Sequence, residues 1–209
     1  MNRHEATTML KQLQGLLIFI AMLATAPAIA DSSPTDDVRT SVEAVIALLR
    51  DDQLDRDTRR DRMREVIDKR FDFRAMSQRT LATNWKKATD AEQQRFTELF
   101  AELIQNSYVS KIESYTNETV EYPGEKQKGR KAEVETRIIT SSAEIPVNYK
   151  VYLKDGTWLV YDVIIEGVSL ISNYRSSYQE IVKRDGFDGL LAQMEEKIRE
   201  LKSAPAETG

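Results

Sequence analysis

Histidine and cysteine, which carry much of nucleophilic catalysis and zinc binding, are almost missing from this sequence. The chain has no cysteine, and its only histidine, His4, lies in the first thirty residues. Once those residues are removed, as their pattern below predicts, neither a Ser-His-Asp nor a Cys-His arrangement can form. A zinc site built on imidazole or thiolate then has no ligands either. The sequence argues against these classes of enzyme.

Carboxylates are the remaining candidates for acid–base chemistry. Asp155 is explained by a turn, and Glu166 stands near a strand end, where acids are usually solvated. Asp162 differs because it lies in the middle of an apolar strand. We interpret Asp162 as a buried, hydrogen-bonded acid that anchors the junction between this strand and the next helix at Gly167, since perturbed acids also occur in structural networks. A catalytic acid is the alternative.

Two short motifs suggest other chemistry but lack essential parts. The segment 167–170, GVSL, has neither the second glycine of a nucleophile elbow nor a histidine partner for Ser169. Gly124 and Gly129 accompany a basic segment without a phosphate-loop pattern. Its cations are Lys126, Lys128, Arg130 and Lys131. We expect a solvated hairpin loop here.

The first thirty residues have the pattern of a secretory signal peptide. Arg3 and Lys11 supply the basic start, residues 15–24 are apolar, and a small-residue sequence ends at Ala30. A membrane anchor is the alternative, but a spanning helix needs about 20 apolar residues. This stretch is shorter and breaks at Pro27. We expect cleavage after Ala30 and export of the remaining chain.

The charge of the exported chain speaks against nucleic acid as a partner. Loss of Arg3, Lys11 and Glu5 with the first thirty residues changes the formal charge from −4 to −5. Binding to a phosphate backbone requires a basic surplus that this chain lacks. For the same reason the charge does not support attraction to anionic membranes. Without cysteine there are no disulfides, so stability must come from the hydrophobic core.

Helical patterns dominate the first half of the exported chain. Ser33 followed by Pro34 predicts a helix start, and a short helix is expected around 71–81. Residues 51–70 are heavily charged, which favours a solvated face, with a docking surface as the alternative. A capping box at 89–92 opens the clearest helix. Its broad apolar side contains Phe96, Leu99, Phe100, Leu103, Ile104, Tyr108, Ile112 and Tyr115.

Beyond residue 116 the apolar residues alternate with period two, which predicts strands. Strands are expected at 132–138, 145–153 and 158–165, with a hairpin turn at 155–156. The last of them is apolar on both faces, which indicates a central strand. Gly167 is expected to end the sheet, Ser169 to cap a helix, and Gly186 to separate that helix from a final one.

These patterns predict a single α+β domain at 31–202, followed by a flexible tail at 203–209. Its antiparallel β-sheet has about four strands, with helices packed on one side. We expect a monomer.

Four blocks of the sequence resemble the MlaC family, the periplasmic phospholipid-binding proteins of the Mla, or toluene-tolerance, lipid transport system. They are residues 70–77 (RFDFRAMS) with Leu81 and Trp85; 94–96 (QRF) with Phe100 and Tyr108; 147–151 (VNYKV); and 158–163 (WLVYDV) with 166–170 (EGVSL) and 173–175 (NYR). The resemblance extends over residues 33–201. One departure is Ala82, because the family usually has a glycine shortly before the tryptophan of the first block.

The resemblance implies helices packed on an antiparallel sheet around an apolar cavity for acyl chains, with the headgroups in water. It implies a periplasmic phospholipid shuttle between an outer-membrane lipoprotein complex and an inner-membrane ABC transporter with its substrate-binding subunit. It also implies no enzymatic activity and no cofactor beyond the phospholipid cargo. The lining residues expected by analogy are Phe96, Phe100, Leu103, Tyr108, Ile138, Val147, Tyr149, Val151, Val163, Ile165, Leu170 and Tyr174.

Because each buried CH₂ contributes roughly 0.8 kcal/mol, acyl chains alone supply ample affinity, and weak headgroup selectivity is expected. Ordinary core packing is the simpler interpretation of any one of these apolar residues. The main alternative function is a periplasmic protein-interaction or chaperone module that uses the same apolar surface. A small-molecule enzyme on a similar α+β scaffold is a third possibility.

Overall fold

The computed structural model describes residues 32–114 and 118–203. The expected signal peptide, its cleavage site and Tyr115 lie outside the described residues, as does the expected tail apart from Ser203, which ends the last helix. Among the described helices, none is both long and apolar enough to cross a membrane.

Within residues 32–114, four α-helices and one short 3-10 helix, η1, precede the sheet. They are α2 (Pro34–Leu49), α3 (Arg56–Arg70), α4 (Phe73–Leu81), η1 (Ala82–Lys86) and α5 (Asp90–Glu113). The Ser33 hydroxyl accepts a hydrogen bond from the backbone N–H of Asp36 at 3.0 Å. Thr89 and Glu92 form the reciprocal capping box at the start of α5. Both helix starts are confirmed where side-chain oxygens satisfy the free N–H groups of the first turn.

A five-stranded antiparallel sheet follows, in the order β1-β2-β3-β4-β5. Its strands are β1 (Thr119–Lys128), β2 (Lys131–Ile139), β3 (Glu144–Lys154), β4 (Thr157–Ile165) and β5 (Val168–Ser169). Asp155 and Gly156 form the predicted turn, with φ of 50° and 78°. The α+β class with an antiparallel sheet is confirmed, with one strand more than expected. Gly167 lies in the turn before β5, so the sheet ends at Ser169.

A bulge in β4 changes which side chains reach the helix-covered face of the sheet. Lys150 pairs with Asp162 while the next residue, Val151, pairs with Val160, which leaves Tyr161 as an extra residue in β4. Such a bulge shifts the alternation by one residue. Val160 and Val163 are consequently both buried in the same core, although their spacing of three would place them on opposite faces of a regular strand.

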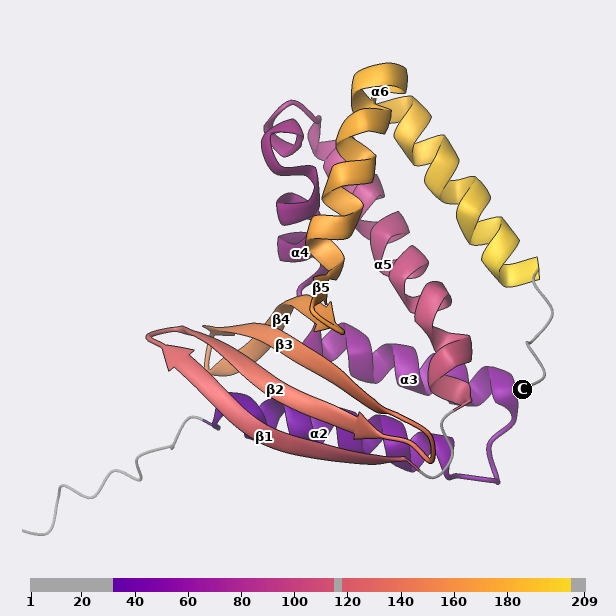
Figure 1. The fold of residues 1–209 in the computed structure, drawn as a ribbon. Coiled ribbons are helices and arrows are strands. Elements are labelled where there is room, and N and C mark those ends of the chain that lie inside the picture. Colours follow the sequence, from indigo (N-terminus) through magenta and orange to yellow (C-terminus); the bar gives the residue numbers. More distant parts are fainter. Residues whose placement is uncertain (1–31, 115–117, 204–209) are drawn as a thin grey trace, which may run out of the picture. The chain divides into compact units, whose positions relative to one another are not determined.

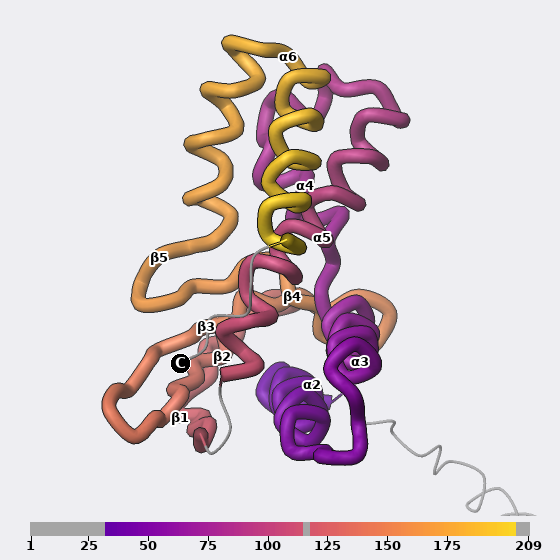
Figure 2. The backbone as a smooth tube through the Cα atoms, turned by 90° about the vertical axis from the view of Figure 1, so that its right-hand side faces the viewer, coloured from indigo at the N-terminus to yellow at the C-terminus, as the bar shows by residue number. Residues whose placement is uncertain are grey.

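The helices form two groups (Figure 1). Helix α2 packs against β1, β2 and β4, and α3 packs against α2 and β4; Figure 2 shows α2 and α3 side by side. Helices α4, α5 and α6 (Leu170–Ser203) pack against one another. Gly186, with φ of 74°, interrupts α6, as the sequence predicted.

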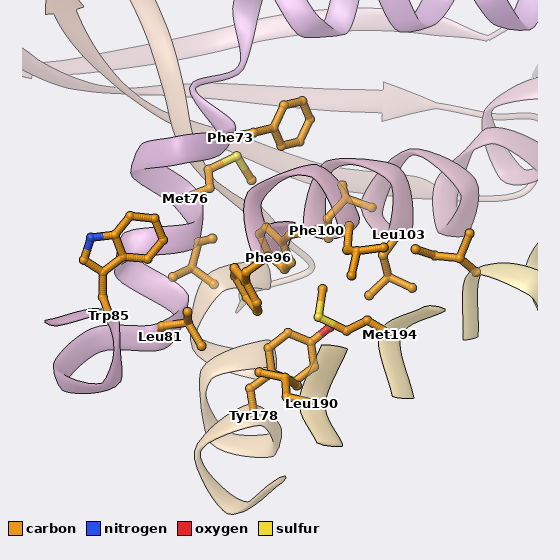
Figure 3. Packing of buried hydrophobic residues seen from close by; sticks show 14 residues of the cluster. Phe73, Met76, Leu81, Trp85, Phe96, Phe100, Leu103, Tyr178, Leu190 and Met194 are labelled. Carbon is orange, nitrogen blue, oxygen red and sulfur yellow. The ribbon is translucent and has the colours of Figure 1, made fainter. Parts of the chain in front are cut away.

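Each group of elements encloses its own buried cluster. The helical core contains Phe73, Met76, Leu81, Trp85, Phe96, Leu99, Phe100, Leu103, Ile104, Ile171, Tyr178, Leu190, Met194 and Ile198 (Figure 3). The sheet core contains Val38, Ala132, Val134, Val147, Val151, Trp158, Val160, Val163 and Leu170. Phe71 and Tyr108 pack against both clusters and so connect them.

Ala82, the departure from the family pattern, lies where the chain leaves α4. Its φ is 50° and its ψ is −119°. Side chains other than glycine rarely adopt a positive φ because the Cβ atom crowds the backbone. The glycine usual in the family suits this backbone better than the alanine present here.

Candidate functional site

Two cavities of about 180 Å³ each lie between the sheet and the helices. The first is bounded mainly by α2, α3 and the sheet, and the second by α3, α5 and the sheet. Some residues line both cavities and form the boundary between them: Val45, Ile67, Phe71, Ile112, Ile138 and Tyr149. The two cavities are therefore neighbouring lobes of one hollow region.

The walls are apolar because each surrounding element presents its hydrophobic face. The sheet contributes side chains of β2, β3 and β4 to the second cavity: Ile138, Ile145, Val147, Tyr149, Val163 and Ile165. Helix α2 contributes Val38, Val42, Val45, Ile46 and Leu49 to the first cavity. Such walls suit hydrocarbon, since a ligand there removes apolar surface from water without leaving polar groups unpaired.

Arg70 fixes the wall of the first cavity. Its guanidinium lies 2.9 Å from the carboxylate of Asp37 and donates hydrogen bonds to the Trp158 carbonyl at 2.7 Å and the Ser41 hydroxyl at 2.8 Å. These contacts join α2, α3 and β4. Although Arg70 lines the cavity, its charge is balanced within the protein.

Long polar side chains connect α3 to α5 beside the second cavity. Arg60 donates to both carboxylate oxygens of Glu113, at 2.7 and 2.6 Å, and Gln105 donates to Asp68 at 2.7 Å. Arg64 donates to Asn106 at 3.3 Å. We call these contacts the α3–α5 seam.

Burial opposes the charged form of Glu113, but the hydrogen bonds and charge of Arg60 and Arg56 outweigh it and hold the pKa of this carboxyl below its ordinary value. Glu113 thus stays ionised at neutral pH, and the seam is an ion pair there.

Tyr149 is the polar group shared by the two lobes. Burial raises the pKa of its hydroxyl to about 12, with a smaller contribution from Tyr122. The hydroxyl is therefore neutral throughout the physiological range.

Seven of the twelve residues expected to contact lipid line these cavities. They are Tyr108, Ile138, Val147, Tyr149, Val163, Ile165 and Leu170. Val151 instead lies in the sheet core with no exposed surface, because the β4 bulge places Val160 opposite it.

The other four expected residues lie in the helical core. Phe96 and Phe100 stack with centroids 5.6 Å apart, and Tyr174 meets Phe100 edge-on at 5.5 Å. Figure 3 shows Phe96, Phe100 and Leu103 among side chains of α4 and α6. The long apolar stripe of α5 thus has two partners: its first half faces helices, and its second half, from Ile104 onward, reaches the cavity. Lipid contact by any of the twelve residues stays a prediction.

Several lining residues were missed from the sequence. Residues on α2 and α3 form much of the walls, among them Val42, Val45, Met63 and Ile67. The helical spacing of these apolar residues was visible in the sequence, but it did not show which elements they face. Arg60 and Arg64, which belong to a segment interpreted as a solvated face, also line the second cavity.

Asp162 lies at the strand–helix junction, as interpreted from the sequence. Its carboxylate accepts hydrogen bonds from the Ser169 hydroxyl at 2.7 Å and the backbone N–H of Ile171 at 3.2 Å. The Ser169 hydroxyl in turn accepts from the N–H of Ser172 at 3.1 Å, and Gly167 has a φ of 83° in the preceding turn. Within the described residues, no acidic cluster is arranged to hold a metal ion.

Comparison with known proteins agrees with this architecture. The family model described as MlaC protein matches residues 39–196. The chain is 28% identical over 120 residues to the intermembrane phospholipid transport system binding protein MlaC of Haemophilus influenzae, which covers 54% of this chain and 56% of that protein. It is 27% identical over 105 residues to the toluene tolerance protein ttg2D of Pseudomonas putida, covering 49% of each. The chain thus spans about half the length of these curated relatives.

A solved structure has the same fold. It is the phospholipid-binding protein from Ralstonia solanacearum in complex with a phospholipid, with a TM-score of 0.75 and 23% sequence identity. The match covers 82% of this chain and 100% of that one.

Proposed function

Since the chain belongs to the MlaC protein family, we propose that it is a periplasmic phospholipid-binding protein that holds acyl chains in its double cavity. In this proposal it carries lipid between an outer-membrane lipoprotein complex and an inner-membrane ABC transporter. The observation that carries the proposal is the pair of adjoining apolar cavities between the sheet and helices α2, α3 and α5.

The energetics of such a site favour lipid. Each CH₂ transferred from water into an apolar site contributes roughly 0.8 kcal/mol, so long acyl chains bind tightly without a charged contact. A dry apolar cavity of about 150 Å³ accepts a ligand the size of benzene, and each lobe here is of that order. We propose that each lobe takes a segment of one chain of a two-chain lipid, with residues that line both lobes, such as Ile138 and Tyr149, lying between the chains.

The alternative of a protein-interaction or chaperone module needs apolar surface on the outside. Among the described residues, Val168, at 58% exposed, is the large hydrophobic side chain that stands out to solvent. Isolated exposed apolar residues are ordinary and do not form a docking patch. The apolar surface instead faces inward, which supports lipid over protein as the occupant.

Release of the lipid requires that the cavity change. A carrier with only one closed state would retain its cargo, whereas a partner that binds an open state more tightly shifts the protein toward release. We propose that the membrane complexes at each end of the route act in this way.

The test is native mass spectrometry of the full chain purified from the periplasm, followed by organic extraction and lipid analysis. We expect phospholipid in stoichiometric amount with the mature protein. A lipid-free, monodisperse protein that binds no added phospholipid would contradict the proposal and favour the protein-interaction module.

A further inference from the structure

The charged side chains that line the second cavity, Arg60, Arg64 and Lys111, are all cations. They come from two elements, α3 and the last turns of α5. By contrast the first cavity is lined by Glu118 as well as by arginines, one of which is paired with Asp37. The two lobes therefore differ in the charged residues that line them.

Two of these cations reach the cavity because one face of α3 carries both charged and apolar residues. Arg60, Met63, Arg64 and Ile67 follow one another at helical spacing, so they share one face of α3. Met63 is buried and Ile67 lines both cavities. Cations thus alternate with apolar groups on the face that borders the cavity, an arrangement suited to a ligand with an apolar body and an anionic head.

Some N–H groups of these cations have no acceptor among the described residues. Glu113 takes Nε and one terminal nitrogen of Arg60, and it also meets Arg56 at 3.3 Å. Arg64 contacts Asp61 and Asn106 through its two terminal nitrogens. Lys111 is exposed, and its ammonium group has no hydrogen-bond or ion-pair partner among the described residues, although its backbone carbonyl accepts from the Ser114 hydroxyl. Part of the donor capacity of Arg60 and Arg64 and the whole of that of the Lys111 ammonium therefore remain for a ligand in the second cavity.

We infer that Arg60, Arg64 and Lys111 form a binding site for the phosphate of the lipid, at the mouth of the second cavity between α3 and α5. The inference rests on the proposed function and deepens it, because it names the headgroup chemistry. Arginine and lysine recognise phosphate oxygens through charge-assisted hydrogen bonds. Glu113 is the competing anion: it holds Arg60 in place when the site is empty and limits the net positive charge.

The site gives the carrier a preference that acyl chains cannot supply. The chains contribute equally to any lipid of the same length, so selectivity must come from the mouth. Lipids that bear a phosphate then bind better than neutral diacylglycerols, in contrast to the weak headgroup selectivity expected from hydrophobic burial alone.

The experiment is isothermal titration calorimetry on the delipidated mature chain with three probes that differ stepwise. Dioctanoyl phosphatidic acid has both chains and phosphate, dioctanoylglycerol has the chains alone, and glycerol 3-phosphate has the phosphate alone. We expect the first to bind about fivefold or more tightly than the second, as one partly exposed charge contact contributes about 1 kcal/mol. Glycerol 3-phosphate should bind far more weakly than either.

Substitutions on both sides of the mouth sharpen the test. Arg64→Gln and Lys111→Gln should each weaken phosphatidic acid severalfold and leave dioctanoylglycerol unchanged, whereas Glu113→Gln should strengthen phosphatidic acid. Arg62→Gln is the matched control, because Arg62 is an exposed residue of the same helix that lines neither cavity. Since the Lys111 ammonium has no partner among the described residues, we expect its substitution to leave the fold intact.

The outcomes separate the two proposals. Equal affinity for phosphatidic acid and dioctanoylglycerol, or equal effects of Lys111→Gln and Arg62→Gln, would overturn the phosphate site while the lipid-carrier function stands. Glycerol 3-phosphate binding as tightly as phosphatidic acid would also overturn it, since the site would then serve free phosphate esters. Failure of both acyl probes to bind would instead contradict the proposed function.

Discussion

The carboxylate of Asp162 lies 2.7 Å from the hydroxyl of Ser169 and receives its hydrogen bond. This contact spans the turn from β4 to the last residue of β5, directly before α6 begins. The second carboxylate oxygen accepts from the N–H of Ile171, so one buried acid caps the helix together with Ser169. We expect this pair to anchor the start of α6 on the sheet.

Asp162→Asn should therefore destabilise the protein by about 2 kcal/mol, because hydrogen bonds to a charged group are replaced by weaker ones at a buried site. The measurement is the free energy of unfolding in urea. Asp188→Asn, at an exposed position of the same helix, should change it by less than about 0.5 kcal/mol. Equal stability of the two variants would remove the anchoring role of Asp162.

Ala82→Gly should stabilise the protein by about 1 kcal/mol, because glycine relieves the crowding of a side chain at positive φ. Ala101→Gly, inside α5, is the control with the opposite sign and should cost about 1 kcal/mol. The measurement is the melting temperature of both variants and of the parent protein in thermal unfolding. A fall in melting temperature with Ala82→Gly would show that this backbone does not favour glycine.

Val147→Trp should lower the amount of phospholipid that copurifies with the protein, because the larger side chain fills part of the second cavity. Val151→Trp is the matched variant in the sheet core, away from the cavities. It should cost about 1–3 kcal/mol by overpacking without a comparable loss of lipid per folded molecule. Extraction and mass spectrometry give the lipid content, and calorimetry the stability. Full lipid occupancy in Val147→Trp would exclude that position from the binding site.

Alkaline pH should weaken the fold through Tyr149. Its pKa is raised from 10.0 to about 12 in the folded chain, so the neutral hydroxyl stabilises the fold fully below pH 10, and this contribution is lost between pH 10 and 12. Unfolding free energies measured from pH 8 to 12 should fall less steeply in Tyr149→Phe than in the parent.

Tyr152→Phe provides the contrast for that measurement. It also removes a raised pKa of about 12, but it deletes the hydrogen bond from Tyr152 to Asp72 as well. This variant should lose stability already at pH 7. An identical pH dependence in Tyr149→Phe and the parent protein would show that folding does not raise the pKa of Tyr149.

Local chemistry explains which parts of the fold were predictable. Ser33, Thr89 and Glu92 cap helices through contacts within four residues, and Asp155 with Gly156 makes a turn that depends on its own backbone angles. Such contacts are fully encoded in adjacent residues. The two-residue strand β5 was not predicted because so short a segment has no alternation to detect.

The candidate site was predictable only in part because it depends on long-range partners. The apolar residues of α5 recur at the same helical spacing along the whole helix. Nevertheless Phe100 packs among helices, whereas Tyr108 lines the second cavity. Periodicity identifies an apolar face but not what packs against it. Arg60 and Arg64 were assigned to solvent because of their charge, whereas their long side chains reach the rim of an apolar space.

Empty lobes should lower the free energy of unfolding of the chain. In engineered cavities the free energy of unfolding falls by about 24 cal/mol per Å³. One empty lobe of about 180 Å³ therefore costs about 4 kcal/mol. The lobes are lined mainly by the sheet and by α2, α3 and α5, so we expect the loss of stability to fall on these elements. Resistance to proteolysis should consequently follow loading, and cleavage of an unloaded carrier would begin in the segments that surround the lobes.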